Sequence, residues 1–262
     1  MSDWLHNLPV PWMALVVFGF TYLIAVAIYA VVTVLAVGER ARSFKAVSPG
    51  MLPPLGIIFG LFVAFTAAQV WSDNDRATAA VNREASALKS VVLLAASFPG
   101  DPETHLLGLV HRYVEDSASR DWPAMARETA DLRMTPQALA DALQLTLALK
   151  PDGPGGVTAQ RDMAGAFQNA LDARRQRILV SRSEVNVVKW SCLYLQAICA
   201  LLAIALVHAD NRLASVLSMG LFATGVAASV LLIAAHDRPF IGQLSVSPEP
   251  LLQVMPDGAK SS

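Results

Sequence analysis

The sequence predicts an all-α membrane protein with four transmembrane helices and a helical insert between the second and third. Of the 262 residues, 54% are hydrophobic and only 16% are charged, whereas about a quarter of a soluble domain is charged. Four apolar runs reach the length of about 20 residues that crosses a bilayer. The segment between the second and third runs has apolar residues at helical spacing. No stretch alternates at period two, so no sheet is expected.

The first predicted span is Trp12–Val37, which contains no charged side chain. A cleaved signal peptide is the alternative interpretation. The residues ahead of the run include no lysine or arginine, and the run is much longer than the apolar core of a signal peptide. A retained span is therefore favoured.

The other predicted spans are Met51–Trp71, Trp190–Val207 and Leu213–Ala235. Each could instead be a buried core helix of a large soluble protein. Their length and lack of charge favour membrane spans, and tryptophans near their ends match the preference of this ring for the membrane interface.

The predicted domains are residues 1–72 with the first two spans, 73–186 as a cytoplasmic helical domain, 187–236 with the last two spans, and 237–262 as a cytoplasmic tail. In the insert, Asp101 reads as a helix cap followed by a first-turn proline. Another helix is expected from Thr135-Pro136. The run Lys150–Gly156 is expected to form a loop, and a last helix is expected from about Thr158 into the third span.

An even number of spans places both termini and the insert on one side of the membrane. Nine lysines and arginines near span ends lie on that side and four on the other, which favours a cytoplasmic insert in a bacterial inner membrane. Three of the four opposing charges, Arg40, Arg42 and Lys45, crowd one short loop.

Several functional classes are disfavoured. The net charge of −1 suggests no nucleic-acid partner, and the five scattered histidines show no metal-ligand spacing. No acid, base and nucleophile can be named together, so neither an enzyme nor a cofactor is expected. The predicted spans contain no Asp, Glu, Lys or Arg, unlike those of ion-coupled transporters. A passive pathway, a scaffold or a sensor remains.

The second span carries two stripes at four-residue spacing. One is small (Gly56, Gly60, Ala64 and Ala68), and the other is bulkier (Pro53, Ile57, Leu61 and Phe65). In a ring of identical subunits, the small face would pack against neighbouring helices while the bulky stripe lined the axis. Alternatively, the small face packs within one subunit and the bulky stripe faces lipid. Periodicity alone leaves both open.

Sequence motifs add a family resemblance. Pro54-Leu55-x-Ile57-x-x-Gly60, followed by Trp71 and by Asn82–Leu88, resembles the second helix and the helix after it in the bestrophin anion channels. The chain is more closely similar to the bestrophin-like family of bacterial membrane proteins. The motifs shared with that family are Gln69-Val70-Trp71, Val81–Ala85, Ala173–Ile178 and Asp237-Arg238-Pro239-Phe240-x-Gly242.

The resemblance implies a homo-oligomer, expected to be a pentamer, that conducts chloride or similar anions. It implies that Pro53, Ile57 and Leu61 form the pore neck; Phe65 is added by spacing. The acidic calcium clasp of animal bestrophins has no counterpart after Phe240, so calcium gating is not expected. The rival function is a non-conducting scaffold or sensor that binds a partner through its cytoplasmic helices.

One further group of candidate residues lies near the end of the insert. Arg174, Arg175 and Arg177 precede the third span, where they would attract anions, contact lipid phosphates or form ordinary surface salt bridges.

Overall fold

The computed structural model describes residues 6–36, 49–133 and 135–255. In these ranges the regular structure is helical and includes no strand, which confirms the predicted all-α fold. The chain divides into two compact units. The first comprises Met1–Ser72 and Glu184–Leu244, and the second comprises Asp73–Ser183 and Ser245–Ser262.

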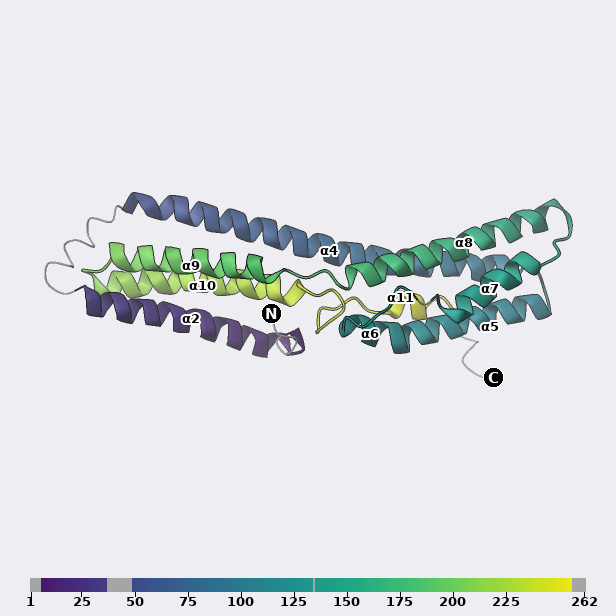
Figure 1. Ribbon diagram of the computed structural model, residues 1–262, viewed down its shortest axis with the longest axis horizontal. Helices are drawn as coiled ribbons and strands as arrows, with labels where there is room; N and C mark the ends of the chain where they lie inside the picture. The colour runs from purple at the N-terminus through teal and green to yellow at the C-terminus, as the bar shows by residue number, and fades with distance from the viewer. Residues whose placement is uncertain (1–5, 37–48, 134, 256–262) are drawn as a thin grey trace. The chain divides into compact units, whose positions relative to one another are not determined.

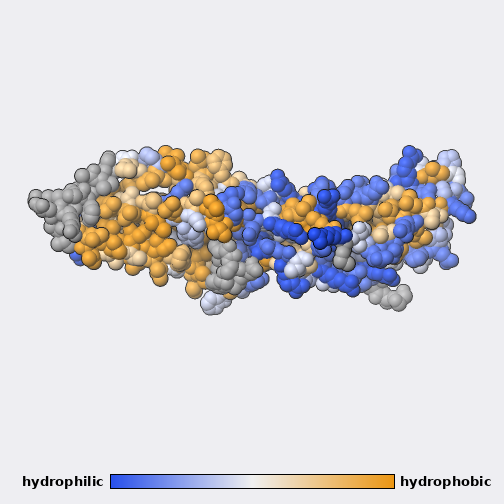
Figure 2. Space-filling view, viewed as in Figure 1, coloured by the Kyte–Doolittle hydropathy of each residue, from blue (hydrophilic) through white to orange (hydrophobic). Residues whose placement is uncertain are grey.

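The first unit is built from α2 (Val10–Leu35), the first part of α4 (Leu52–Ala95), α9 (Val187–Val207) and α10 (Arg212–His236). All four helices are long and apolar enough to cross a membrane, as predicted. Helices α2, α9 and α10 pack against one another (Figure 1). On the face shown in Figure 2, hydrophobic residues dominate this unit, whereas hydrophilic residues prevail on the second.

The spans bury only part of their apolar surface within the protomer. In α4, 17% of the most apolar window is buried, compared with 33% in α9 and in α10. The buried α4 residues Phe59, Ala67 and Val70 join a core formed with the other three spans. Most of the apolar surface of α4 is therefore available to lipid or to another subunit.

Helix α4 does not end where the second span was expected to end. It continues through Ser72-Asp73-Asn74-Asp75 to Ala95, so the expected span and the expected helix after it form one element. Arg76 pairs with Asp73 at 3.5 Å, one helical turn apart. These polar residues can end a membrane span without ending a helix, since none is a glycine or proline. The 44 residues of α4 are about twice as many as a membrane span requires.

The second unit contains the last part of α4 and six further elements. These are α5 (Asp101–Asp116), the π-helical segment η2 (Ser117–Asp121), α6 (Trp122–Ala126), α7 (Gln137–Ala148), α8 (Gly153–Val180) and α11 (Glu249–Leu252). Helix α7 packs against both α5 and α8.

Two helix starts in the insert differ from expectation. Gly100 with φ +94° is the cap of α5, so Asp101 lies in the first turn as an acidic residue and does not cap the helix. Helix α8 begins at Gly153, inside the run expected to be a loop, because proline is favoured in a first helical turn. The helix also ends at Val180 instead of running into α9; Asn186 caps α9 by accepting a hydrogen bond from the Lys189 backbone N–H at 2.9 Å.

Candidate functional site

The bulky stripe of α4 is exposed on the protomer. Pro53, Ile57, Leu61 and Phe65 are all exposed, with fractions of 69% at Ile57 and 68% at Phe65. The protomer core uses a different face of the same helix, which includes Phe59. The residues expected to form the neck are therefore not buried inside one subunit.

The small-residue face of α4 is uncovered as well. Gly56, Gly60, Ala64 and Ala68 are exposed, and a Cβ added at Gly56 or Gly60 would meet no atom within 4 Å. The alternative in which this face packs against the other spans of the same subunit is therefore wrong for the described residues. Both stripes face outward from the protomer, where lipid or a neighbouring subunit can cover them.

Specific contacts hold the third face of α4 against its neighbours. The ring of Phe59 lies 5.6 Å from that of Phe222 on α10, centroid to centroid. Near the other end of the span, the Lys189 ammonium on α9 donates to the side-chain oxygen of Gln69. These contacts fix which faces of α4 remain outward.

In the second unit, a buried ion pair joins α4 to α8. The Arg177 guanidinium donates to both carboxylate oxygens of Glu84, from Nε at 2.8 Å and from Nη2 at 3.0 Å, and both side chains are fully buried. The guanidinium also lies 4.3 Å above the ring of Trp122. The expectation that Arg177 contacts lipid or attracts anions is therefore wrong, because no part of its side chain reaches the surface.

Helix α5 and the π-helical segment η2 complete this network. The Tyr113 hydroxyl donates to Glu84, and the Ser117 hydroxyl accepts from Arg177 at 2.9 Å. Burial and the Glu84 carboxylate raise the pKa of Tyr113 well above its ordinary value, so the phenol remains a donor. Burial opposes the charge of Arg177, but Glu84, Tyr113 and Asp121 outweigh it and raise the pKa of the guanidinium. The buried charges thus have the partners that a low-dielectric interior demands.

The other two arginines differ from each other. Arg174 forms a bidentate pair with Asp121, at 2.8 and 3.0 Å, and is half-buried. Arg174 therefore forms a salt bridge, as one of the three interpretations expected, and its charge is not free to attract anions. Arg175 is exposed, which is compatible with anion attraction, with contact to lipid phosphates and with a surface salt bridge.

A second buried polar cluster lies in the first unit, just after α10. Asp237 accepts a hydrogen bond from the backbone N–H of Val185 at 2.6 Å, and its other oxygen lies 3.5 Å from Nε2 of His6. Asp237 therefore connects three segments that are distant in sequence: the one before α2, the one before α9 and the one after α10.

Gly242 is required for this arrangement. Its φ is +86°, and an added Cβ would lie 2.8 Å from the backbone oxygen of His6. Gly242→Ala is expected to lower the free energy of unfolding by about 1–3 kcal/mol, because strain and a backbone clash coincide. Gly108→Ala is the matched control; this helical glycine has open space around it, so alanine should stabilise by about 0.5–1 kcal/mol. Thermal unfolding of both variants in detergent checks this prediction, and equal stability would contradict it.

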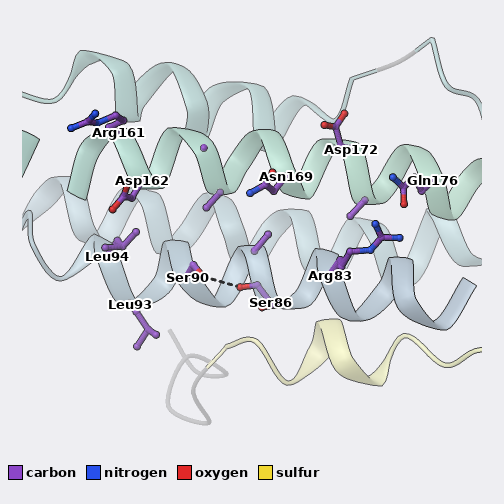
Figure 3. Close-up of a pocket in the computed structure, with 14 residues that line it drawn as sticks. Arg83, Ser86, Ser90, Leu93, Leu94, Arg161, Asp162, Asn169, Asp172 and Gln176 are labelled. Carbon is purple, nitrogen blue, oxygen red and sulfur yellow. Dashed lines mark hydrogen bonds between the residues drawn. The ribbon is translucent and has the colours of Figure 1, made fainter. Parts of the chain in front are cut away.

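A groove lies between the last part of α4 and α8 (Figure 3). Its volume is about 1060 Å³, and its walls carry charges of both signs, including Arg83, Arg161, Asp162 and Asp172. The Ser90 hydroxyl donates to the Ser86 carbonyl within the same helix. This mixed polar lining is typical of a solvated surface.

Fold and site together define a four-span helical membrane protein whose second span exposes an apolar stripe beside a small-residue face. The family model of the bestrophin-like domain matches residues 19–251, and the chain belongs to this family. Comparison with curated proteins and with solved structures yields no match.

The motifs that carry the family resemblance contain the anchoring residues described above. Gln69, Glu84, Arg177, Asp237 and Gly242 all fall within them. Sequence reasoning missed the partners in the insert, namely Tyr113, Ser117 and Asp121. One signal for Glu84 was available. It lies three residues after Val81 and four before Leu88, so helical spacing places its carboxylate on the apolar face of the helix.

Proposed function

We propose that the protein is a homo-oligomeric ion channel with an apolar neck formed by α4. The observation that carries this proposal is the division of α4 into three faces. One face packs in the protomer core, while the bulky stripe and the small-residue face are both uncovered. In a ring of subunits, the small-residue face would allow close contact between neighbouring helices. The bulky stripe would form a narrow apolar constriction, which can gate by dewetting.

The finer parts of the proposal rest on the family resemblance and on charge. A pentamer that conducts chloride or similar anions is what the resemblance to bestrophin channels implies. Both termini and the insert are proposed to lie in the cytoplasm of a bacterium, with the spans in its inner membrane, because more lysines and arginines lie near the span ends on that side. Of the opposing charges, Arg40, Arg42 and Lys45 lie outside the described residues.

A scaffold or sensor is the second candidate, and the insert gives it little support. In the insert, the leucines that could form a surface for a partner are Leu139, Leu143 and Leu147, which follow one another at four-residue spacing. Leu139 is fully buried and Leu143 is half-buried, because α7 packs against α5 and α8. Only Leu147 remains exposed, at 64%, and a single exposed leucine is ordinary on a protein surface.

Planar-bilayer recording of the purified protein tests the channel proposal. Replacing Ile57 and Leu61 by alanine removes apolar bulk from the neck and lowers the cost of wetting it, so chloride current is expected to rise by about tenfold. Leu221→Ala on α10 is the matched control, since Leu221 is also exposed on a span, and should leave the current unchanged. Silence of the wild type and of all variants would favour the scaffold.

A further inference from the structure

An apolar groove of about 420 Å³ lies between α2 and α9 in the first unit. Phe20 and Ile24 form its α2 wall, and Trp190, Tyr194 and Ile198 form much of its α9 wall. The ring of Tyr194 packs edge-to-face against that of Phe20, with centroids 5.7 Å apart. Both walls belong to membrane-spanning helices, so the groove opens toward the bilayer.

The dimensions of the groove match one leaflet of a bilayer. Its α9 wall runs from Val187, the first residue of that helix, to Ile198. These residues are about 16 Å apart along the helix axis, and half of a hydrocarbon core is about 15 Å. Helices α2 and α9 begin on the same side of the membrane, since two spans separate their starts. The groove therefore extends from one membrane surface to about the mid-plane.

The polarity of the lining follows the same direction. Ser191 and Trp190 lie near the surface end, and Ile198 lies at the deep end. Within the described ranges, the hydroxyls of Ser191 and Tyr194 have no hydrogen-bond partner. Tyrosine and tryptophan prefer this interfacial depth, where ester and phosphate oxygens of lipids accept hydrogen bonds.

We propose that this groove binds one phospholipid, with an acyl chain along Phe20, Ile24 and Ile198 and with its ester oxygens near Ser191 and Tyr194. A helix of a second copy fits less well. Close helix contact in membranes needs small residues on the walls, and the walls here carry aromatic rings and isoleucines. A helix is also about 10 Å thick, whereas an acyl chain is thin enough to lie between these side chains. The proposal rests on the membrane spans and is independent of channel activity.

Photolabelling in lipid nanodiscs tests this site. The probe is a phospholipid with a diazirine on its acyl chain, and adducts are mapped by peptide mass spectrometry of the full-length protein. Adducts are expected to concentrate on Phe20–Ile24 and Tyr194–Ile198, even though the reference positions Leu213 and Leu221 on α10 are more exposed. The proposal is overturned if adducts are distributed in proportion to exposure. It is also overturned if the groove residues carry no adducts because another subunit shields them from the probe.

Variants separate the site from the surrounding bilayer. Ile24→Trp fills the groove and should lower labelling there about tenfold, while Leu221→Trp on α10 should leave it unchanged. Ser191→Ala combined with Tyr194→Phe keeps the groove open, so it should lower labelling by the phospholipid about tenfold through the loss of two hydrogen bonds. A diazirine fatty acid without a headgroup is the second probe. If it labels the groove as well as the phospholipid does, or if the double variant labels like wild type, the headgroup contacts proposed here are wrong.

Discussion

Replacing Arg177 by methionine is expected to lower the free energy of unfolding by about 3–5 kcal/mol. The substitution leaves the Glu84 carboxylate fully buried without its cationic partner, while the Tyr113 hydroxyl remains as a single donor. Methionine preserves much of the side-chain volume, so the loss reports the uncompensated charge more than a cavity. Thermal and denaturant unfolding of the purified protein in detergent, followed by circular dichroism, measures the effect.

Two further variants make the interpretation specific. Arg175→Met removes the same charge from an exposed neighbour in α8 and should change stability by no more than about 0.5 kcal/mol. Replacing Glu84 and Arg177 together by methionine should recover much of the loss, because an apolar pair of similar volume can replace a buried ion pair at little cost. If Arg177→Met is as stable as Arg175→Met, the buried pair does not hold α4 and α8 together.

Gly60→Leu is expected to abolish assembly while leaving the protomer folded. A Cβ added at this exposed position meets no atom of its own subunit within 4 Å, whereas the bulk of leucine would prevent the close approach of a neighbouring helix. Native mass spectrometry in detergent should therefore show an oligomer for wild type and a monomer for this variant. Its helical circular dichroism should remain unchanged.

Gly19→Leu is the matched control for assembly. Gly19 is an exposed helical glycine of α2 that also has open space around it, so leucine there adds the same bulk to a different span. This variant should assemble like wild type. Equal assembly of both variants would show that the small-residue face of α4 forms no contact between subunits.

The four spans could be predicted from sequence because bilayer thickness imposes a length and an apolar composition on each of them. In the structure, α2, α9 and α10 begin and end within a few residues of the predicted spans, whereas α4 extends well beyond its predicted end. Polar residues after Trp71 mark where the apolar run stops, but helix continuation depends on backbone propensity, and Ser72–Asp75 contains no residue that breaks a helix. Hydropathy therefore located the apolar part of α4 but not the end of the helix.

The stripes on α4 followed from periodicity, whereas their exposure did not. Spacing of four residues groups Ile57 with Leu61 and Gly56 with Gly60, but it cannot say which face a protomer buries. The structure shows that the core takes a third face, which includes Phe59. Only three-dimensional packing could show that the protomer buries neither stripe.

Long-range polar contacts were also beyond sequence reasoning. Glu84 and Arg177 lie 93 residues apart in the chain, and no local pattern pairs them. The π-helical segment η2 brings Ser117 and Asp121 to the arginines, and none of the sequence patterns described above predicts it. For this reason Arg177 was expected to lie on the surface near the membrane.

Cysteine cross-linking at Ile57 tests the proposed arrangement of α4 around a shared axis most directly. In a background with Cys192 and Cys199 replaced by serine, Ile57→Cys is treated in membranes with a short bis-maleimide, and Leu221→Cys serves as the control on α10. If α4 lines the axis, copies of residue 57 from neighbouring subunits lie close together, and covalent dimers form at this position but not at residue 221. Absence of dimers at residue 57, or equal dimer formation at both positions, would contradict an α4-lined pore.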